Sequence, residues 1–570
     1  MSPEAYSVPS QSAELLHKGV LENPNLSSNI PPNAHHLVNF VKFRGNAKPS
    51  LPINWRFAES ISSLKGLEAL WVNALLGAKH QQGPVNIEID TDHASLFVMS
   101  GLLVDVVDHQ GSPLGQNLSR IQRIKSIFPT PGQDLRLGTP HRAALTGIYK
   151  TKDDQFYHLH SSLNANPSLT ALGIPLDCEA SSIAEATNDI QSYVANFGAK
   201  ELDTLLNDTY RQAGSICLTT DEYKASAHGQ LNAKAGLYEL SHVPSETQKP
   251  TWWQDTAETG VKRPLAGLKV LEMTRVIAAP TISRGLAELG ASVMRVTGPG
   301  VPDIYPLHAD LNWGKWNCSI DLKTEVGKEE LRNLIRQADV VVDGYRPGVM
   351  EKLGLGREVV LELVKDRSYG LVYVRENCYG WTGPWQGRSG WQQISDANCG
   401  VSYEYGRATG NDEPVTPVFP NSDYCTGAIG VSGVINAIIE RAEKGGSIHL
   451  DTSINYYSQW LVNSVGTYPA EVWDDLWQRH QNLTFRHYDN MPVMIPIMME
   501  SLSKNSSAEL FQPHFFEVRY SAAIDHYFKS LRPVLTFPAK EVRTGFNIGT
   551  RTNGHDAARW PEDLQAEAVA

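Results

Sequence analysis

Residues 267–280 read GLKVLEMTRVIAAP, and this stretch decides the fold class. Its first half, 267–273, is a short apolar run that predicts a buried β-strand. Pro280 suits the first turn of a following helix, because a helix leaves the N–H group of that position unpaired anyway. Gly290 suits the end of that helix. A strand followed directly by a helix is typical of the start of a βαβ unit.

Later segments continue the same pattern. Residues 291–296, 338–343 and 370–374 are apolar almost throughout, and the intervening segment 328–337 has helical spacing. Continuous apolar strands separated by helices indicate a parallel sheet that is covered on both faces. We therefore predict an α/β fold, with a Rossmann-like parallel sheet in a large domain. No G-x-G-x-x-G pattern follows the first strand, which argues against NAD and flavin as cofactors.

The size and charge of the chain exclude several classes of function. A chain of 570 residues needs at least two hydrophobic cores. Its formal net charge of -12 argues against nucleic acid as a partner. It has neither a recognisable secretory leader nor an apolar run of membrane-spanning length, so we expect a cytoplasmic protein with no membrane partner. Its cysteines and histidines lack the spacing of metal ligands, and we expect no metal.

One pattern occurs twice in the chain. Residues 71–76 and 83–89 have the pattern of a helix, a glycine turn and an alternating strand, and residues 434–439 and 446–452 repeat it. The two copies share an Asn-Ala pair and the position of the turn. We interpret them as an internal repeat.

An acidic residue, Asp423, precedes the second copy, in the run PNSDYCTG at 420–427. Apolar residues follow it at helical spacing, so Ser422 or Asp423 is expected to cap a helix. Glycines at every third position from Gly427 would let another backbone approach that helix. The local pattern alone favours the cap. The same position suits a nucleophile, because a helix N-terminus stabilises a carboxylate and offers free N–H groups to an oxyanion.

Five stretches between residue 264 and about residue 460 follow one another in a familiar order. They are PLAGLKVLEMTRVIAAP (264–280), LAELGASVMRV (286–296), SIDLKTEVGKEELRNLIRQADVVVDGYRPGVMEKLGLG (319–356), YGWTGPW (379–385) and SDYCTGAIGVSGVINAIIER (422–441). Through these stretches the region resembles the N-terminal part of the class III CoA-transferases, the CaiB/BaiF family. The resemblance implies an enzyme that moves CoA between an acyl-CoA thioester and a carboxylic acid, with CoA as co-substrate.

The resemblance also assigns roles to residues. In that family an aspartate attacks the acyl-CoA, and Asp423 occupies the matching position. Gly427 and neighbouring backbone N–H groups are the expected oxyanion donors. Arginine and lysine suit the phosphate groups of CoA. The residues that the resemblance places at CoA are Arg275, Val276, Ala278, Lys315 and Arg346.

Two other functions stay open. Racemases of the same family pair the aspartate with a His-Asp dipeptide. The chain has Trp391 and Gln392 there, which exchange no proton near neutral pH, and this favours the transferase. The second alternative is a non-catalytic descendant that binds a ligand or a partner. It is suggested by Trp313 and Thr297-Gly298, which replace expected charged residues, and by the missing glycine-rich loop after residue 460.

The resemblance further suggests how the chain is divided. We expect residues 36–243 to form a smaller α+β domain like the C-terminal half of a family member, because 149–157 reads as a β-hairpin. Residues 264–460 are the expected CoA-binding and catalytic region. The other expected regions are a loose tail at 1–35, a linker at 244–263, and at 461–570 an extension that packs back on the large domain.

The family forms interlocked dimers, so we expect a homodimer. The swapped order of the halves would also allow those contacts within one chain. In this order Glu59 falls near the position of Asp423, and we interpret Glu59 as a relic.

Overall fold

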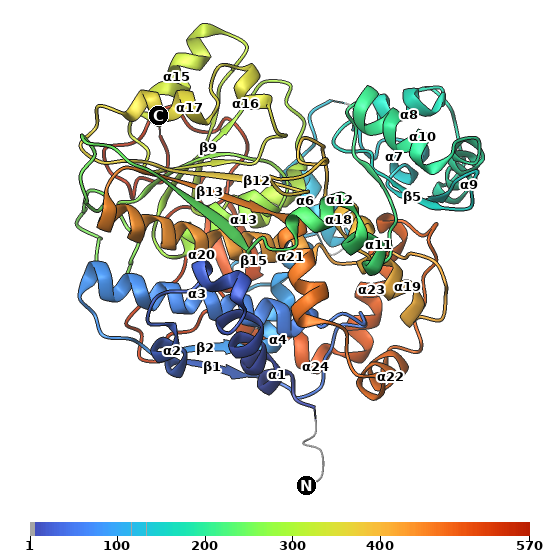
Figure 1. Cartoon of the computed structure of the whole chain (residues 1–570), viewed down its shortest axis with the longest axis horizontal. Coiled ribbons are helices and arrows are strands. Elements are labelled where there is room, and N and C mark those ends of the chain that lie inside the picture. Colours follow the sequence, from blue (N-terminus) through green and yellow to red (C-terminus); the bar gives the residue numbers. More distant parts are fainter. Residues whose placement is uncertain (1–5, 116, 133, 570) are drawn as a thin grey trace.

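The computed structural model describes residues 6–115, 117–132 and 134–569 (Figure 1). Its centre is a seven-stranded sheet in which only β7 runs antiparallel to its neighbour. The predicted Rossmann-like parallel sheet is confirmed. Across the sheet, the strands are β10 (Lys315–Ser319), β9 (Ser292–Thr297), β8 (Lys269–Met273), β11 (Val340–Asp343), β12 (Val372–Asn377), β13 (Ser447–Ser453) and β7 (Tyr238–Val243).

Helices cover both faces of this sheet, as continuous apolar strands require. On β11, Val340 and Val342 pack toward the face that carries α13 (Ala278–Glu288) and α20 (Asn421–Lys444). Val341, between them, belongs to the core of the other face. That face is covered by α15 (Glu325–Ile335) and α17 (Arg357–Val364).

A second helix–turn–strand unit packs against the first. α3 (Phe57–His80) and α20 each have 24 residues and contact each other, and they run side by side in Figure 1. β2 (Ile87–Asp90) follows α3 and pairs in parallel with β1 (Val41–Arg44), as β13 follows α20 and pairs in parallel with β12. The structure thus confirms the helix–turn–strand unit at both predicted places.

The loose tail expected at 1–35 was wrong for its described part. α1 (Val8–Leu15) and the π-helical turn η1 (Leu16–Leu21) pack against α3, and Leu15, Leu16 and Val20 are buried. The sequence of this segment is rich in Pro and Asn, which led us to expect a loose tail, but these residues lie at helix starts. Asn23, for example, caps the next 3-10 helix by accepting a hydrogen bond from the Asn25 N–H group.

A small antiparallel lobe stands apart at the right of Figure 1 and has its own apolar core. Its β4 (Gly147–Lys150) and β5 (Phe156–Leu159) form the predicted hairpin, whose turn places Asp154 at a φ of 60°. β6 (Gly214–Ile216) pairs with β5. The helices of the lobe are α7 (Pro140–Ala144), α8 (Asn166–Leu172), α9 (Ile183–Val194) and α10 (Ala199–Thr204).

The C-terminal segment returns to the sheet. β14 (Phe516–Ser521) and β15 (His526–Leu531) extend a small sheet from β3 (Asp105–Val107), and the Trp560 ring packs edge-on against Trp316 of β10. The proposed limits of the five regions stay predictions.

The remaining α-helices are α2 (Ala34–Leu37), α4 (Thr91–Phe97), α5 (Ser100–Leu103), α6 (Arg120–Ile127), α11 (Thr220–Ala225), α12 (Ala227–Asn232), α14 (His308–Leu311), α16 (Val349–Lys352), α18 (Gln392–Asn398), α19 (Val401–Ala408), α21 (Ile454–Trp460), α22 (Ala470–Arg479), α23 (Met491–Asn505) and α24 (Ser507–Leu510). Within the described ranges no helix is long and apolar enough to cross a membrane.

Glycines bring α20 close to α13. A Cβ atom added to Gly427 would lie 2.4 Å from Cβ of Thr281, and one added to Gly430 would lie 2.5 Å from Cδ1 of Ile282. Side chains at these two positions would push the helices apart. The close approach matters because it holds the start of α20, with Asp423, beside the start of α13.

We predict that Gly430→Val separates these helices and lowers stability by ~1–3 kcal/mol, the usual cost of overpacking a core. The measurement is the thermal unfolding midpoint of the whole chain. Gly387→Val is the matched control, because no atom lies within 4 Å of a Cβ placed on Gly387. Equal midpoints for the two variants would show that the contact between α13 and α20 is not tightly packed.

Candidate active site

Asp423 lies in the first turn of α20 but does not cap it. The helix begins at Asn421 and its N-cap is Pro420, which makes Asp423 the third helical residue. The side chain is 9% exposed, and no described residue donates a hydrogen bond to its carboxylate. The expected capping role was therefore wrong: the carboxylate is turned toward a cavity instead of its own backbone.

Burial alone raises the pKa of Asp423 to about 7. A carboxylate in water is stabilised by hydration, and one inside a protein loses that stabilisation unless other groups replace it. Here a helix N-terminus compensates in part. Near neutral pH the group is divided between its two protonation states, so a substantial share is ionised, poorly solvated and able to react.

The backbone N–H groups around Asp423 are only partly used. Those of Asn421 and Tyr424 bond to the carbonyl groups of Phe419 and Pro420. Within the described chain, the N–H groups of Ser422 and Asp423 have no backbone acceptor, as expected in a first helical turn. They are better oxyanion donors than the N–H of Gly427, which the helix directs to a carbonyl one turn earlier. The expectation for Gly427 as a donor was wrong, and its role is to let α13 approach.

The start of α13 contributes a strained turn. Val276 has a φ of 74°, a left-handed conformation that is rare for a β-branched residue. Such strain costs on the order of 1–3 kcal/mol and is concentrated at functional sites. The turn places Val276, Ile277 and Ala278 in the wall of the cavity that Asp423 also lines. Two helix N-termini therefore meet at this carboxylate.

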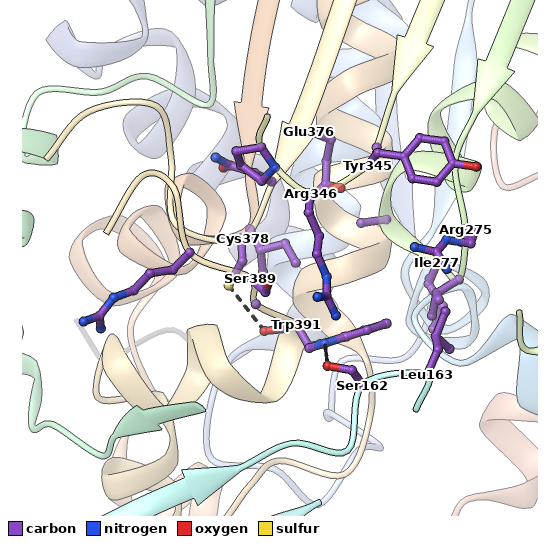
Figure 2. A pocket seen from close by; sticks show the side chains of 18 of the residues that line it. Ser162, Leu163, Arg275, Ile277, Tyr345, Arg346, Glu376, Cys378, Ser389 and Trp391 are labelled. Carbon is purple, nitrogen blue, oxygen red and sulfur yellow. Dashed lines mark hydrogen bonds between the residues drawn. The ribbon is translucent and has the colours of Figure 1, made fainter. Parts of the chain in front are cut away.

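We call this first space the polar cavity. It has a volume of about 380 Å³ and lies between the ends of the large sheet and the small lobe, which supplies Ser162, Leu163 and Gln212. Trp391 joins the two sides, because its indole N–H donates to Ser162 Oγ at 3.3 Å and its ring stacks on His160. Figure 2 shows this contact beside the Arg346 guanidinium group.

Arginines gather at the polar cavity. Arg275, Arg346 and Arg388 line it, and Arg388 pairs with Asp203 of the small lobe at 2.8 Å. Arg346 donates a hydrogen bond to the backbone carbonyl of Arg211, which also belongs to the small lobe. Burial, followed by the charges of Arg275 and Arg211, lowers the pKa of Arg346. Arg211, Arg275 and Arg346 form no ion pair with a described residue. An uncompensated cluster of cations is a site for an anion, and guanidinium groups fit phosphate oxygens.

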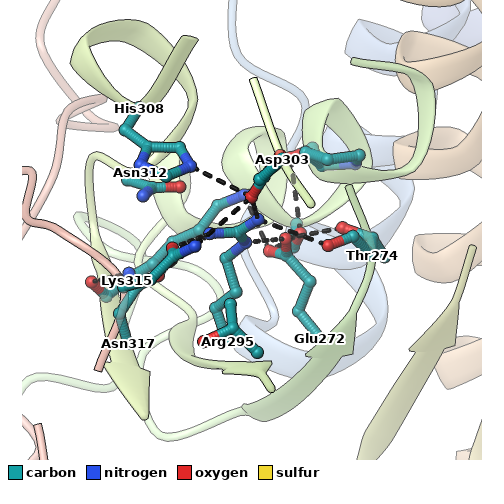
Figure 3. Close-up of polar contacts among 12 residues, drawn as sticks. Glu272, Thr274, Arg295, Asp303, His308, Asn312, Lys315 and Asn317 are labelled. Atoms are coloured by element: carbon teal, nitrogen blue, oxygen red, sulfur yellow. Dashed lines mark hydrogen bonds and ion pairs between the residues drawn. The ribbon is translucent and has the colours of Figure 1, made fainter. Parts of the chain in front are cut away.

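Lys315 does not belong to this cluster. Its ammonium group is fully buried, pairs with Glu272 at 2.7 Å and donates to the Pro280 carbonyl (Figure 3). Burial lowers its pKa to about 8, although Glu272 acts in the opposite direction. The expectation that Lys315 binds a phosphate group of CoA was wrong, because Lys315 lines neither of the cavities at Asp423. Sequence position alone could not reveal that its charge is used internally.

Glu376 was missed by the sequence analysis. It is the penultimate residue of β12 and lies in the wall of the polar cavity. The side chain is 9% exposed, and its Oε1 atom has no hydrogen-bond partner among described residues. Burial, and then the charge of Asp423, raise the pKa of Glu376 to about 8. It is therefore mostly protonated at neutral pH and can donate a hydrogen bond. A carboxyl group at the end of a predicted parallel strand is the signal that could have identified it.

A second and larger space, which we call the wide cavity, also reaches Asp423. It has a volume of about 690 Å³ and shares Val276, Ile277 and Trp391 with the polar cavity. Its other walls are α6, residues 134–137, the loop at 297–307 and the start of α23. Asp423 therefore lies where two spaces of different character meet, an arrangement that suits a reaction between two bound molecules.

Glu59 repeats the position of Asp423 in the other long helix, α3, but lines neither the polar cavity nor the wide cavity. It is the third residue of α3 and is fully buried. Its carboxylate accepts hydrogen bonds from the hydroxyl groups of Tyr6 and Tyr468, the latter at 3.1 Å. The two tyrosine side chains thus occupy the space beside Glu59, whereas the corresponding space beside Asp423 is a cavity.

Comparison with known proteins gives consistent matches. Residues 265–488 match the family model described as CoA-transferase family III. The chain is 49% identical to the acetyl-coenzyme A transferase nodX of Hypoxylon pulicicidum, over 99% of this chain and 95% of that protein. It is 29% identical to an acyl-CoA transferase of Gibberella moniliformis, over 90% of this chain and 89% of the other. A CAIB/BAIF family protein from Brucella suis has a TM-score of 0.39 at 19% identity, covering 52% of this chain and 97% of that one.

The buried carboxylate predicts a dependence of stability on pH. Because the pKa of Asp423 is about 7 in the folded chain and about 3.9 when unfolded, stability should fall as pH rises through this range. Asp423→Asn should remove this loss, so at pH 8 its unfolding midpoint should lie above that of the unsubstituted chain. The corresponding gain in the free energy of unfolding is up to ~4 kcal/mol. The two curves should converge below about pH 4.

Asp303→Asn is the control with the opposite expectation. Although burial opposes it, the ion pair with Arg295 and the hydrogen bond with His308 hold the pKa of Asp303 well below its usual range. Its charge therefore stabilises the fold above about pH 4, and the variant should melt below the unsubstituted chain at pH 8. An Asp423→Asn variant that is less stable at pH 8 would contradict the buried, unpartnered carboxylate.

Proposed function

Because this chain belongs to CoA-transferase family III, we propose that it moves CoA from an acyl-CoA thioester to a carboxylic acid through a covalent intermediate on Asp423. The observation that carries this proposal is the carboxylate itself. It is buried, has no hydrogen-bond partner among described residues, and lies where two cavities meet. A purely structural carboxylate would be paired, as Glu59 is.

Each proposed step exchanges one acyl bond for another. An Asp423 oxygen attacks the thioester carbonyl, the C–S bond breaks, and CoA thiolate leaves an acyl-aspartyl anhydride. The thiolate then attacks the Asp423 carbonyl and releases the first carboxylate, which leaves an aspartyl-CoA thioester. The acceptor carboxylate repeats these two steps in reverse order. No net proton, electron or water molecule is consumed, so the chemistry needs a dry site more than an acid–base pair.

The surroundings of Asp423 support this chemistry. Each tetrahedral intermediate carries an oxyanion, and preorganised N–H donors stabilise such a charge strongly in a site without water. The free N–H groups at the start of α20, including that of Ser422, and that of Ala278 at the start of α13 are the proposed donors. A protonated Glu376 adds a further donor without placing a second negative charge beside the nucleophile.

The proposed CoA site is the arginine side of the polar cavity. Arg211, Arg275 and Arg346 would meet phosphate groups, and the strained turn at Val276 and Ala278 would lie along the part that carries the thioester. The support is the lack of ion pairs at these three arginines, and the position of Arg275 and Arg346 in the wall of the cavity that Asp423 also lines. Trp391 and Gln392 give no support to proton exchange at the substrate α-carbon, as a racemase needs.

The homodimer stays a prediction. Both the large sheet and the small lobe that line the polar cavity come from one chain. A second chain is therefore not required to complete this wall of the site.

Covalent catalysis should leave a trace on Asp423. After incubation with a panel of acyl-CoA esters and hydroxylamine, mass spectrometry should find a hydroxamate at Asp423, because hydroxylamine attacks both the anhydride and the thioester. Asp423→Asn should abolish both the adduct and CoA transfer.

Glu59→Gln is the matched control, because Glu59 is the third residue of α3 as Asp423 is the third residue of α20. This variant should keep the adduct at Asp423. Turnover without an adduct, together with an active Asp423→Asn variant, would rule out the covalent route. Exchange of the substrate α-proton with deuterated water, without transfer, would favour the racemase.

Arg346→Ala should weaken binding of CoA thioesters by about 10- to 100-fold, the range for loss of one charge-assisted contact. Isothermal calorimetry with CoA and the KM for acyl-CoA both measure this effect, and kcat should change less. The control is Arg332→Ala on the outer helix α15, whose partner is Glu329. An unchanged Kd for Arg346→Ala would remove this residue from the proposed site.

A further inference from the structure

We propose that the wide cavity binds the carboxylic acid partner of the reaction, and that this acid is bulky and mainly apolar. This inference rests on the proposed function, because it names the substrate class that reaches Asp423 from the side away from the arginine cluster. The argument uses the walls of the wide cavity, its size and its position relative to the polar cavity.

Apolar side chains form much of the wall that lies away from the large sheet. Ile121 and Ile124 come from α6, and Met491 and Ile495 come from α23. Such a wall cannot satisfy the hydrogen bonds of a small polar acid, but it gains free energy from each methylene group that it removes from water. Methionine adds adaptability, because its unbranched side chain fits surfaces of different shape.

Apolar side chains of this cavity are also open to solvent. Ile121 is 51% exposed, and Leu135, Leu137, Ile304 and Ile495, which line the cavity as well, are half-buried. Soluble proteins rarely gather partly exposed apolar side chains around a cavity unless the cavity takes an apolar molecule. The volume of about 690 Å³ is well above what a short acid such as propionate needs.

The position of the wide cavity fits an acid better than it fits CoA. The cations expected to anchor CoA, Arg275 and Arg346, line the polar cavity but not the wide cavity. An acid in the wide cavity would place its carboxyl group at Asp423, where the cavities meet. Arg120, Lys125 and Arg136 also line the wide cavity and form no ion pair with described residues. They can meet a polar substituent of the acid or a phosphate of CoA, and the following experiment separates these cases.

The test measures CoA transfer from acetyl-CoA to straight-chain acids from propionate to dodecanoate. We expect kcat/KM to rise about two- to fourfold per methylene until the cavity is filled. Ile495→Trp and Ile121→Trp should fill the cavity, and each should lower kcat/KM for dodecanoate at least about tenfold. For propionate, and for the KM of acetyl-CoA, changes should stay within about twofold.

Ile497→Trp is the matched control. This residue is on the same helix as Ile495, but it is exposed and is not part of the described lining of the cavity, so dodecanoate should react normally. Because Ile121 and Ile497 are at the surface, these substitutions should leave the fold intact.

Three results would overturn the assignment. A wild-type chain that prefers propionate to dodecanoate would exclude an apolar acid. A rise of about tenfold in the KM for acetyl-CoA in the filled variants would assign the cavity to CoA. Equal loss in the Ile497→Trp control would show that the effect is not specific to the cavity. Absence of the Asp423 hydroxamate would instead overturn the proposed function, so the two failures are distinguishable.

Discussion

The burial of α20 between two other helices is the constraint on which the site depends. α13 lies against the Gly427 and Gly430 side of α20, and α3 covers another side. A helix buried over most of its length carries whatever stands in its first turn into the interior. Asp423 is therefore desolvated by the architecture of the chain, and its raised pKa is a consequence of packing. A dry carboxylate destabilises the fold, and reactivity is the property gained in return.

The charges around the sheet show how the same residue types serve two purposes. Glu272, Arg295 and Lys315 form a buried ion network below the loop at 297–307, with Asp303 joining from that loop (Figure 3). Paired charges in the interior can fix the geometry of a loop, but they cannot bind a substrate, because their partners are already in place. Cations available to a ligand are those without partners. This criterion separates Arg346 and Arg275, which follow β11 and β8, from Lys315, which begins β10 of the same sheet.

The sequence was sufficient to predict the elements but not the use of individual side chains. Apolar runs such as 338–343 predicted the parallel sheet, because strands buried on both faces leave a continuous pattern. The echo of 71–76 in 434–439 predicted the two helix–turn–strand units. The loose tail failed because α1 is stabilised by packing on α3, a contact distant in sequence. Arg211 and Glu376 were missed for a similar reason: only the folded chain brings the small lobe and the end of β12 to one cavity.

The pair Asp423 and Glu59 shows what distinguishes the proposed nucleophile from a buried carboxylate that is already paired. Both are carboxylates at the third position of a 24-residue helix, both are buried, and burial raises the pKa of each. Residue type, helix position and desolvation are thus nearly the same. The difference is the neighbour: hydroxyl groups of Tyr6 and Tyr468 occupy the oxygens of Glu59, whereas the oxygens of Asp423 face open cavities. Because Tyr6 belongs to the N-terminal segment that packs on α3, the ordering of that segment is what closes one of two similar sites. A carboxylate at a helix start is available to a substrate when the rest of the chain leaves its oxygens free.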